Sequence, residues 1–322
     1  MKKYAFFLTL TLVLLSCKRT DVIIDESTFP DYNFRHFVLS QWYGKDGVLT
    51  SSEISEITEI KVEKMNIEDL RGIEYFTSLE TLYCKENKLT SLDLSNNTKM
   101  WRLFCWSNRL TTLNVSQNKE LQVLRCDDNE LNKIDISNNI KLRSIRCGHN
   151  QLLSLDVSNN KALESLDCEH NKLTAIDVKD NTNLEYLSCS ENPLKSLDVS
   201  NNIALKQLYC DKDQLTALDV SKNQMLETLF CRGNRLSSID LSNNKSLKSL
   251  AICNNQLNTI NLSMNTMLKE LWCYNNQLTE LDLTKNTALE LLWCYNNKLP
   301  EIDLSHNTAI VEIRETENPA NR

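Results

Sequence analysis

The sequence predicts a mostly β solenoid, an elongated fold in which one short structural unit is stacked many times. Three ladders of residues support this prediction, because each recurs every 21 positions without an insertion. A cysteine ladder spans Cys84–Cys294 and is broken only by Ile252. An asparagine ladder spans Asn87–Asn297 with Asp213 as its exception, and a second one spans Asn97–Asn307 unbroken.

The unit reads L-x-x-L-x-C-x-x-N-x-L-x-x-L-D-hydrophobic-S-x-N. Side chains alternate between the two faces of a strand, so Leu82 and Cys84 are expected to point inward while Tyr83 and Lys85 point outward. Copies stacked about 4.8 Å apart would form one parallel sheet over a continuous core, on the concave side of the solenoid. The alternation at Leu92–Leu94 predicts a second short extended segment on the opposite wall.

This unit resembles the leucine-rich repeat, with Cys where Leu commonly stands. Its 21-residue length and its cysteine ladder are most similar to the internalin-type repeats of bacterial surface proteins. The resemblance covers residues 79–309 and implies a right-handed solenoid of the α/β-horseshoe class. It says less about function, because leucine-rich repeats present many unrelated binding surfaces.

Both asparagine ladders are interpreted as structural. Each unit must turn twice, and each turn would leave backbone donors and acceptors unpaired in a poorly solvated interior. Asn carries a donor and an acceptor and tolerates left-handed backbone angles, so stacked Asn side chains can satisfy the turns. An unpaired buried polar group would cost about 1–3 kcal/mol.

Residues 1–16 are predicted to be a lipoprotein signal peptide. Lys2 and Lys3 give the positive start, Ala5–Leu15 the apolar stretch, and Leu14–Cys17 a cleavage motif that resembles the bacterial lipobox. The resemblance implies that Cys17 is lipidated, whereas an ordinary secretory peptide is the alternative. The apolar run is shorter than the roughly 20 residues of a membrane span. We therefore expect a lipid-anchored protein of the bacterial cell envelope, at the outer membrane.

Four further segments are expected. Residues 17–30 read as a polar tether and residues 31–56 as a helical cap. Within the cap, Phe34, Phe37, Val38 and Trp42 have helical spacing, and the Thr50–Glu53 segment fits a capping box that opens a second helix. Residues 57–313 form the repeats, the first of which diverges, as solenoid ends require. Residues 314–322 read as a tail, with no recognisable C-terminal cap.

Charge and cysteine content exclude several functions. The formal charge is −7, and it becomes −9 when Lys2 and Lys3 leave with the signal peptide, which argues against a nucleic-acid partner. The 12 cysteines suggest disulfides in an exported protein, but the 21-residue spacing favours reduced, inward-pointing thiols. A zinc site is not expected, because the sequence has no paired C-x-x-C motif and no His belongs to the cysteine ladder. Because Ile252 takes the inward position of its repeat, Cys253 is expected to be an exposed lone thiol.

No catalytic constellation or cofactor motif interrupts the repeat, so no enzyme, cofactor or metal site is predicted. One row needs weighing: Asp128, His149, His170 and Glu191 hold equivalent positions about 5 Å apart in four successive repeats. A divalent metal could bridge such neighbours. A solvated row at a turn is the interpretation we favour.

Outward positions of the strands carry the candidate binding residues, because they are free to vary. Clustered exposed aromatic rings usually mark a binding surface, although they can also pair across strands to stabilise the sheet. The aromatic candidates are Trp272, Tyr274, Trp293, Tyr295, Tyr209 and Phe230 near the C-terminal end, and Tyr83, Phe104 and Trp106 near the N-terminal end. Arg125 and Arg146 lie in the charged region between them.

These features predict a surface-anchored binding or adhesion module that recognises a protein partner through its concave face. A glycan-binding lipoprotein is the alternative suggested by the tryptophans, and a structural envelope protein is a third.

Overall fold

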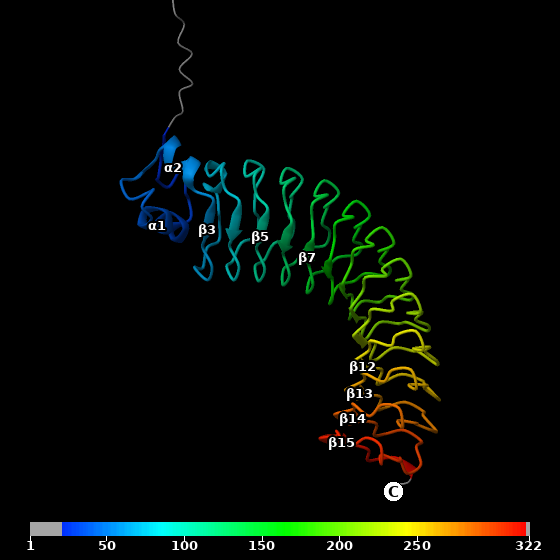
Figure 1. Ribbon diagram of the computed structural model, residues 1–322. Coiled ribbons are helices and arrows are strands. Elements are labelled where there is room, and N and C mark those ends of the chain that lie inside the picture. The colour runs from blue at the N-terminus through cyan, green and yellow to red at the C-terminus, as the bar shows by residue number, and fades with distance from the viewer. Residues whose placement is uncertain (1–20, 320–322) are drawn as a thin grey trace, which may run out of the picture.

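The computed structural model describes residues 21–319, a curved solenoid whose strands line the inner side of the arc (Figure 1). One parallel sheet of 13 strands follows the chain order from β3 to β15. The strands are β3 (Glu59–Lys61), β4 (Thr81–Tyr83), β5 (Arg102–Phe104), β6 (Val123–Arg125), β7 (Ser144–Arg146), β8 (Ser165–Asp167), β9 (Tyr186–Ser188), β10 (Gln207–Tyr209), β11 (Thr228–Phe230), β12 (Ser249–Ala251), β13 (Glu270–Trp272), β14 (Leu291–Trp293) and β15 (Glu312–Arg314). The predicted fold class is confirmed.

The strand register turns the 21-residue period into rows of equivalent side chains. Leu82 of β4 pairs with Leu103 of β5, and every following pair up to β15 keeps this offset. Leu82, Leu103 and the neighbouring Cys84 have no exposed surface. Each fully buried Leu contributes about 1.5–3 kcal/mol to stability.

The cysteine ladder lies in the core in its thiol form. All 11 cysteines of residues 21–319 are buried and free of disulfide bonds. Burial raises the pKa of the Cys189 thiol well above its usual range, as it does for its ladder neighbours Cys168 and Cys210. These thiols therefore stay protonated and act as small apolar groups.

Side chains of both asparagine ladders donate hydrogen bonds to backbone carbonyls, but the two ladders differ in what their side-chain oxygens accept. In the Asn87 ladder, Asn171 Nδ2 donates to the carbonyls of Cys147 and Cys168 at 3.0 and 3.1 Å, and its Oδ1 accepts the Leu152 amide at 2.9 Å. In the Asn97 ladder, Asn160 Nδ2 donates to two carbonyls of the preceding turns. The Oδ1 atoms of that second ladder have no hydrogen-bond partner among the described residues. Both ladders therefore satisfy backbone carbonyls, as expected for the turns, but only the first also accepts backbone amides.

Buried and exposed residues alternate along the back wall as predicted, but this wall forms only isolated β-bridges. Leu92 and Leu94 are buried around the exposed Asp93. Parallel bridges form only along Asp93, Asn114 and Asp135, and elsewhere in residues 21–319 this wall has no assigned strand. The Asp93 carboxylate instead accepts the Ser95 amide at 2.9 Å and closes a turn.

A helical cap covers the first turn of the solenoid (Figure 1). It contains α1 (Tyr32–Ser40) and α2 (Ser51–Glu56), and a 3-10 turn η1 (Ile73–Tyr75) follows in the first repeat. The predicted capping box of α2 is present, with Thr50 and Glu53 bonded in both directions. Asp31 joins the cap to the repeats, because one carboxylate oxygen caps α1 through the Phe34 amide and the other accepts the Glu68 amide at 2.8 Å.

The structure corrects two expectations about the cap. From residue 21 onward the expected tether of residues 17–30 is part of the cap. There β1 (Val22–Ile23) pairs antiparallel with β2 (Val48–Leu49), and Phe29 is fully buried. Trp42 does not face the core, because α1 ends at Ser40 and the chain turns, leaving Trp42 62% exposed. The turn needs Gly44, since a Cβ there would lie 2.2 Å from the Val38 carbonyl oxygen.

The repeat pattern also extends beyond the expected boundary at residue 313. Asn318 is buried and continues the Asn87 ladder, with its Nδ2 donating to the Cys294 carbonyl at 3.2 Å and its Oδ1 accepting the Asn297 amide. The residues expected to be a tail, 314–322, therefore include the end of β15 and one more ladder position. Cys17 and the predicted signal peptide lie outside the described residues, among which no helix is long and apolar enough to cross a membrane.

Candidate ligand-binding face

The concave sheet presents two main rows of outward side chains. One row holds the last residue of each strand, including Tyr83 and Trp272, and we call it the Trp272 row. The other lies two residues later in each repeat, includes Tyr274, and is called the Tyr274 row. Because the repeats are in register, neighbours in a row come from adjacent strands, about 4.8 Å apart.

Four of the C-terminal aromatic candidates form a two-by-two patch. Trp272 pairs in register with Trp293, and their ring centroids are 6.5 Å apart. Tyr274 and Tyr295 stack with centroids 4.5 Å apart and ring planes 6° apart. The strand β15 holds Trp293 on one side, because the Trp293 Nε1 donates to Glu312 and the Arg314 guanidinium lies 4.0 Å from the centroid of its ring. All four rings are half-buried.

This patch continues into a longer run of rings. The ring centroids of Phe230 and Trp272 are 5.7 Å apart across the small Ala251, and those of Phe230 and Tyr209 are 5.2 Å apart. Tyr209 in turn contacts Tyr186 at 5.5 Å. We call these five residues, which extend from β9 to β14, the aromatic ribbon: Tyr186, Tyr209, Phe230, Trp272 and Trp293.

The N-terminal candidates also meet, but cations cover them. Tyr83 and Phe104 stack at 4.7 Å, and Phe104 meets Trp106 edge-on at 5.9 Å. The Trp106 ring lies 4.6 Å from Lys85 Nζ and 4.0 Å from the Arg125 guanidinium, which come from the two neighbouring turns. These cation–π contacts occupy ring surface that a ligand would otherwise reach.

Charged residues separate the two aromatic regions. Arg125 is paired with Asp127 at 3.1 Å, whereas Arg146 is exposed. Burial and the nearby Glu169 carboxylate raise the pKa of Asp167 to about 6. The Asp167 and Glu169 side chains lie over Gly148, where a Cβ would approach both within 3.3 Å.

Cys253 is not the exposed thiol that the sequence predicts. It does occupy the outward Tyr274 row, since Ile252 fills the core position, yet it has no exposed surface. The hydroxyl of Tyr274 is hydrogen-bonded to the Cys253 side chain, and this bond, followed by burial, raises the pKa of Tyr274. Burial also raises the pKa of Cys253. Large row neighbours therefore hide a thiol that the repeat pattern alone places outside.

The row that includes His149 and His170 lies at the turn after each strand, in the left-handed backbone region. The two imidazole rings stack at 4.2 Å, and His170 Nε2 lies 3.0 Å from a Glu191 carboxylate oxygen. Among residues 21–319 no group of three or more His, Cys, Asp or Glu side chains is arranged to hold a metal ion. We keep the interpretation of a row at a turn.

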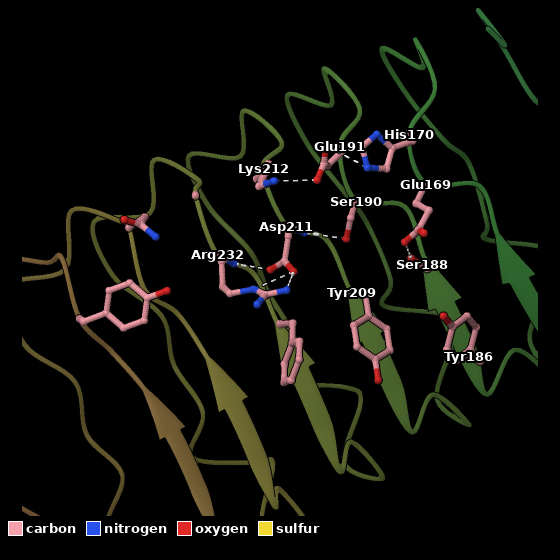
Figure 2. Close-up of a pocket in the computed structure, with 14 residues that line it drawn as sticks. Glu169, His170, Tyr186, Ser188, Ser190, Glu191, Tyr209, Asp211, Lys212 and Arg232 are labelled. Carbon is pink, nitrogen blue, oxygen red and sulfur yellow. Dashed lines mark hydrogen bonds and ion pairs between the residues drawn. The ribbon is translucent and has the colours of Figure 1, made fainter. Parts of the chain in front are cut away.

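A hollow of about 460 Å³ opens at the centre of the face, between β8 and β13 (Figure 2). Its floor contains Ser188 and Ser190, small members of rows that elsewhere hold large side chains. Tyr209 forms one side, and the ion pair of Asp211 with Arg232 forms another. The volume falls within the range of small-molecule sites, about 300–1,000 Å³.

Paired charges fix the rim of the hollow. Asp211 Oδ2 accepts from both Nε and Nη2 of Arg232, at 2.9 and 2.6 Å. Glu191 binds Lys212 Nζ at 2.7 Å on one oxygen and His170 on the other. Figure 2 shows these pairs side by side along the rim. Such bridges hold their side chains in one orientation.

Comparison with known structures identifies the fold family. The functional domain of InlJ from Listeria monocytogenes, described as including a cysteine ladder, superposes with a TM-score of 0.81 and 33% sequence identity. The superposition covers 93% of this chain and 72% of that one. The chain belongs to the internalin-like leucine-rich-repeat family. No protein-family model matches it.

Other comparisons agree on the internalin-like fold and limit what can be transferred. An internalin, InlF, from Listeria monocytogenes gives a TM-score of 0.75 at 23% identity, over 92% of this chain and 98% of that one, which shows the fold alone. Internalin J of Listeria monocytogenes is 38% identical over 71 residues. That match spans 22% of this chain and only 8% of Internalin J.

The outward positions of the repeat predict the aromatic candidates, but they predict neither the hollow nor the involvement of Tyr186. Two features of the sequence could have indicated the hollow. Ser188 and Ser190 are successive outward residues in one repeat, and Asp211 and Arg232 are opposite charges 21 positions apart in one row. Small residues beside large ones in such rows indicate a depression, and the charge spacing indicates a cross-strand ion pair.

Proposed function

We propose that this protein is a lipid-anchored binding protein of the bacterial cell envelope that recognises a protein partner through its concave face. The aromatic ribbon carries the proposal. Five half-buried rings follow one another across β9 to β14. Aromatic side chains dominate the central hot spots of protein interfaces, and solenoids commonly bind along their concave surfaces.

The fold and its relatives support a binding role. The Leu, Cys and Asn ladders build the core and the turns. The outward rows of the sheet are the positions at which the repeats differ most. The same fold occurs in the LRIM1/APL1C complex, at 21% identity to this chain, a likeness that concerns the fold alone. The cell-envelope location rests on the lipobox-like Leu14–Cys17 and on the likeness to internalin repeats.

The test is the double variant Trp272→Ala, Trp293→Ala, with Arg146→Ala as the control. The purified chain is first probed against arrays of purified extracellular proteins and, in parallel, of glycans. We expect the double variant to lose binding to the protein hit by 2 kcal/mol or more, with a nearly unchanged melting temperature, because these rings point away from the core. The control should bind normally, since Arg146 is an exposed member of the same row.

Unchanged binding with a collapsed melting temperature would show that the two tryptophans stabilise the sheet instead. A glycan array hit that depends on Trp272 and Trp293, without a protein hit, would favour the glycan alternative.

A further inference from the structure

We infer that the central hollow is a binding site for a neutral saccharide, formed by Ser188, Ser190, Tyr209, Asp211 and Arg232. This site shares Tyr186, Tyr209 and Phe230 with the aromatic ribbon, but it binds a different class of ligand and does not require that the protein-binding proposal be correct. The inference rests on the shape of the hollow, the chemistry of its lining and the balance of its charges.

The shape comes from the absence of large side chains at two successive outward positions. Ser188 follows Tyr186 by two residues in β9, and its in-register neighbour in β10 is Tyr209. Ser190 lies in the Tyr274 row, where other repeats carry Trp106, Tyr274 or Tyr295. The same backbone positions thus accept large rings elsewhere, so the depression results from side-chain choice and not from strand geometry.

The lining combines a ring surface with fixed polar groups. Tyr209 and Tyr186 present aromatic rings to the hollow (Figure 2). The hydroxyl of Ser190 accepts the Asp211 amide at 3.0 Å, and the hydroxyl of Ser188 donates to Glu169 at 3.0 Å. A pyranose has one largely apolar face and a rim of hydroxyl groups. It can therefore stack on a ring while its hydroxyls meet fixed carboxylate, guanidinium and hydroxyl groups.

The charges select against an anionic ligand. Three carboxylates line the hollow, from Glu169, Glu191 and Asp211, against the two cations Lys212 and Arg232. These five acidic and basic side chains therefore carry one excess negative charge. Both cations are already bridged to carboxylates, Lys212 to Glu191 and Arg232 to Asp211. A sugar acid would have to displace these bridges, whereas a neutral sugar would not.

The experiment measures sugar binding to the purified chain by isothermal titration calorimetry. The probes are the neutral sugars lactose, cellotriose, maltotriose and chitotriose, and sialyllactose as the acidic counterpart of lactose. We expect at least one neutral probe to bind and sialyllactose to bind at least tenfold more weakly than lactose. Failure of all four neutral probes at millimolar concentration, or a preference for sialyllactose, would overturn the inference.

Two variants locate the bound sugar. Ser188→Phe with Ser190→Tyr fills the hollow with side chains that the same rows already carry, and it should abolish binding without changing the strand content. Ser165→Tyr is the matched control, because Ser165 pairs in register with Tyr186 and does not line the hollow. Sugar binding retained by the filled variant would place the sugar elsewhere and refute the site.

Tyr209→Ala guards against misfolding of the filled variant. Loss of the ring should weaken binding of the neutral probe about tenfold, in line with the strength of ring contacts. An unchanged affinity would contradict the inference. The Trp272→Ala, Trp293→Ala variant should keep sugar binding, so failure of the protein-binding proposal and failure of this one give different results.

Discussion

Asp213→Asn should stabilise the protein, and more strongly at high pH than at low pH. Asp213 stands where the ten other ladder positions between Asn87 and Asn297 carry Asn, and it is only 5% exposed. One carboxylate oxygen accepts the Asn192 amide at 2.9 Å, but the other has no hydrogen-bond partner within residues 21–319. In the next repeat, Asn234 Nδ2 donates to the Cys210 and Cys231 carbonyls at 2.8 and 3.1 Å. The carboxylate therefore faces carbonyl oxygens where an amide would donate.

The magnitude follows from the pKa. Burial, and then the neighbouring Asp211 and Glu191 carboxylates, raise the pKa of Asp213 to about 7, from the model-peptide value of 3.8. Between these two pH values the folded state holds a proton that the unfolded state has lost, so stability falls as pH rises through this window. At about 1.4 kcal/mol per pH unit, the penalty reaches on the order of 4 kcal/mol above pH 7 and disappears near pH 4.

Asn has no proton to lose and restores the donated hydrogen bonds, each worth about 1 kcal/mol. The melting temperature of Asp213→Asn, followed by circular dichroism at pH 4.5, 6 and 8, should exceed that of the parent most at pH 8. Asn192→Asp is the reverse change at the preceding ladder position, where Asn192 is 2% exposed, and it should lower the melting temperature with the same pH trend. Exposed Asp219→Asn should give no gain at pH 8, because Asp219 accepts the Ser221 amide at 2.8 Å and this hydrogen bonding lowers its pKa, the opposite of the shift at Asp213. A gain for Asp213→Asn that is equal at all three pH values would refute the assigned pKa, and no gain would refute the unpaired carboxylate.

Three further predictions concern cysteines. Cys189→Ala should cost about 1–2 kcal/mol for the lost volume and Cys189→Asp several kcal/mol for an unpaired buried charge, and near-zero effects of both in urea melts would contradict an inward ladder. Thiol titration of the native protein should find no fast reaction at Cys253, whereas Tyr274→Ala should release one reactive thiol; a fast thiol in the parent would argue against the Tyr274 cover. Cys17→Ser should block lipidation, and a variant that still labels with palmitate and remains in the membrane fraction would disprove the anchor.

The 21-residue period predicts the interior of this protein well. A residue one period from its neighbour meets the same backbone and the same packing, so Leu82, Cys84 and Asn97 fix the environment of a whole ladder each. The sheet, its register and the meeting of Trp272 with Trp293 follow from that rule alone.

The period does not predict features that depend on side-chain size or on the ends of the repeat array. Cys253 is outward by position but is covered by Tyr274, a contact set by rotamers. Ser188 makes a hollow only because larger side chains surround it. At the N-terminus no repeat pattern exists, so the burial of Phe29 and the exposure of Trp42 depend on how the cap folds over the first turn.

Because the repeat array has no insertions, the number of repeats sets the distance between the two aromatic regions. Phe104 and Trp272 are separated by eight strand steps, which is roughly 38 Å along the sheet at about 4.8 Å per step. Removing residues 143–163 deletes one whole repeat, joins Leu142 to Glu164 in register, and leaves both aromatic regions and the hollow intact. A partner that bridges the two aromatic regions would meet them about 5 Å too close together and bind more weakly, whereas a partner seated at one end would not sense the change. The number of repeats is then itself a specificity element, set by the span of whatever the face holds.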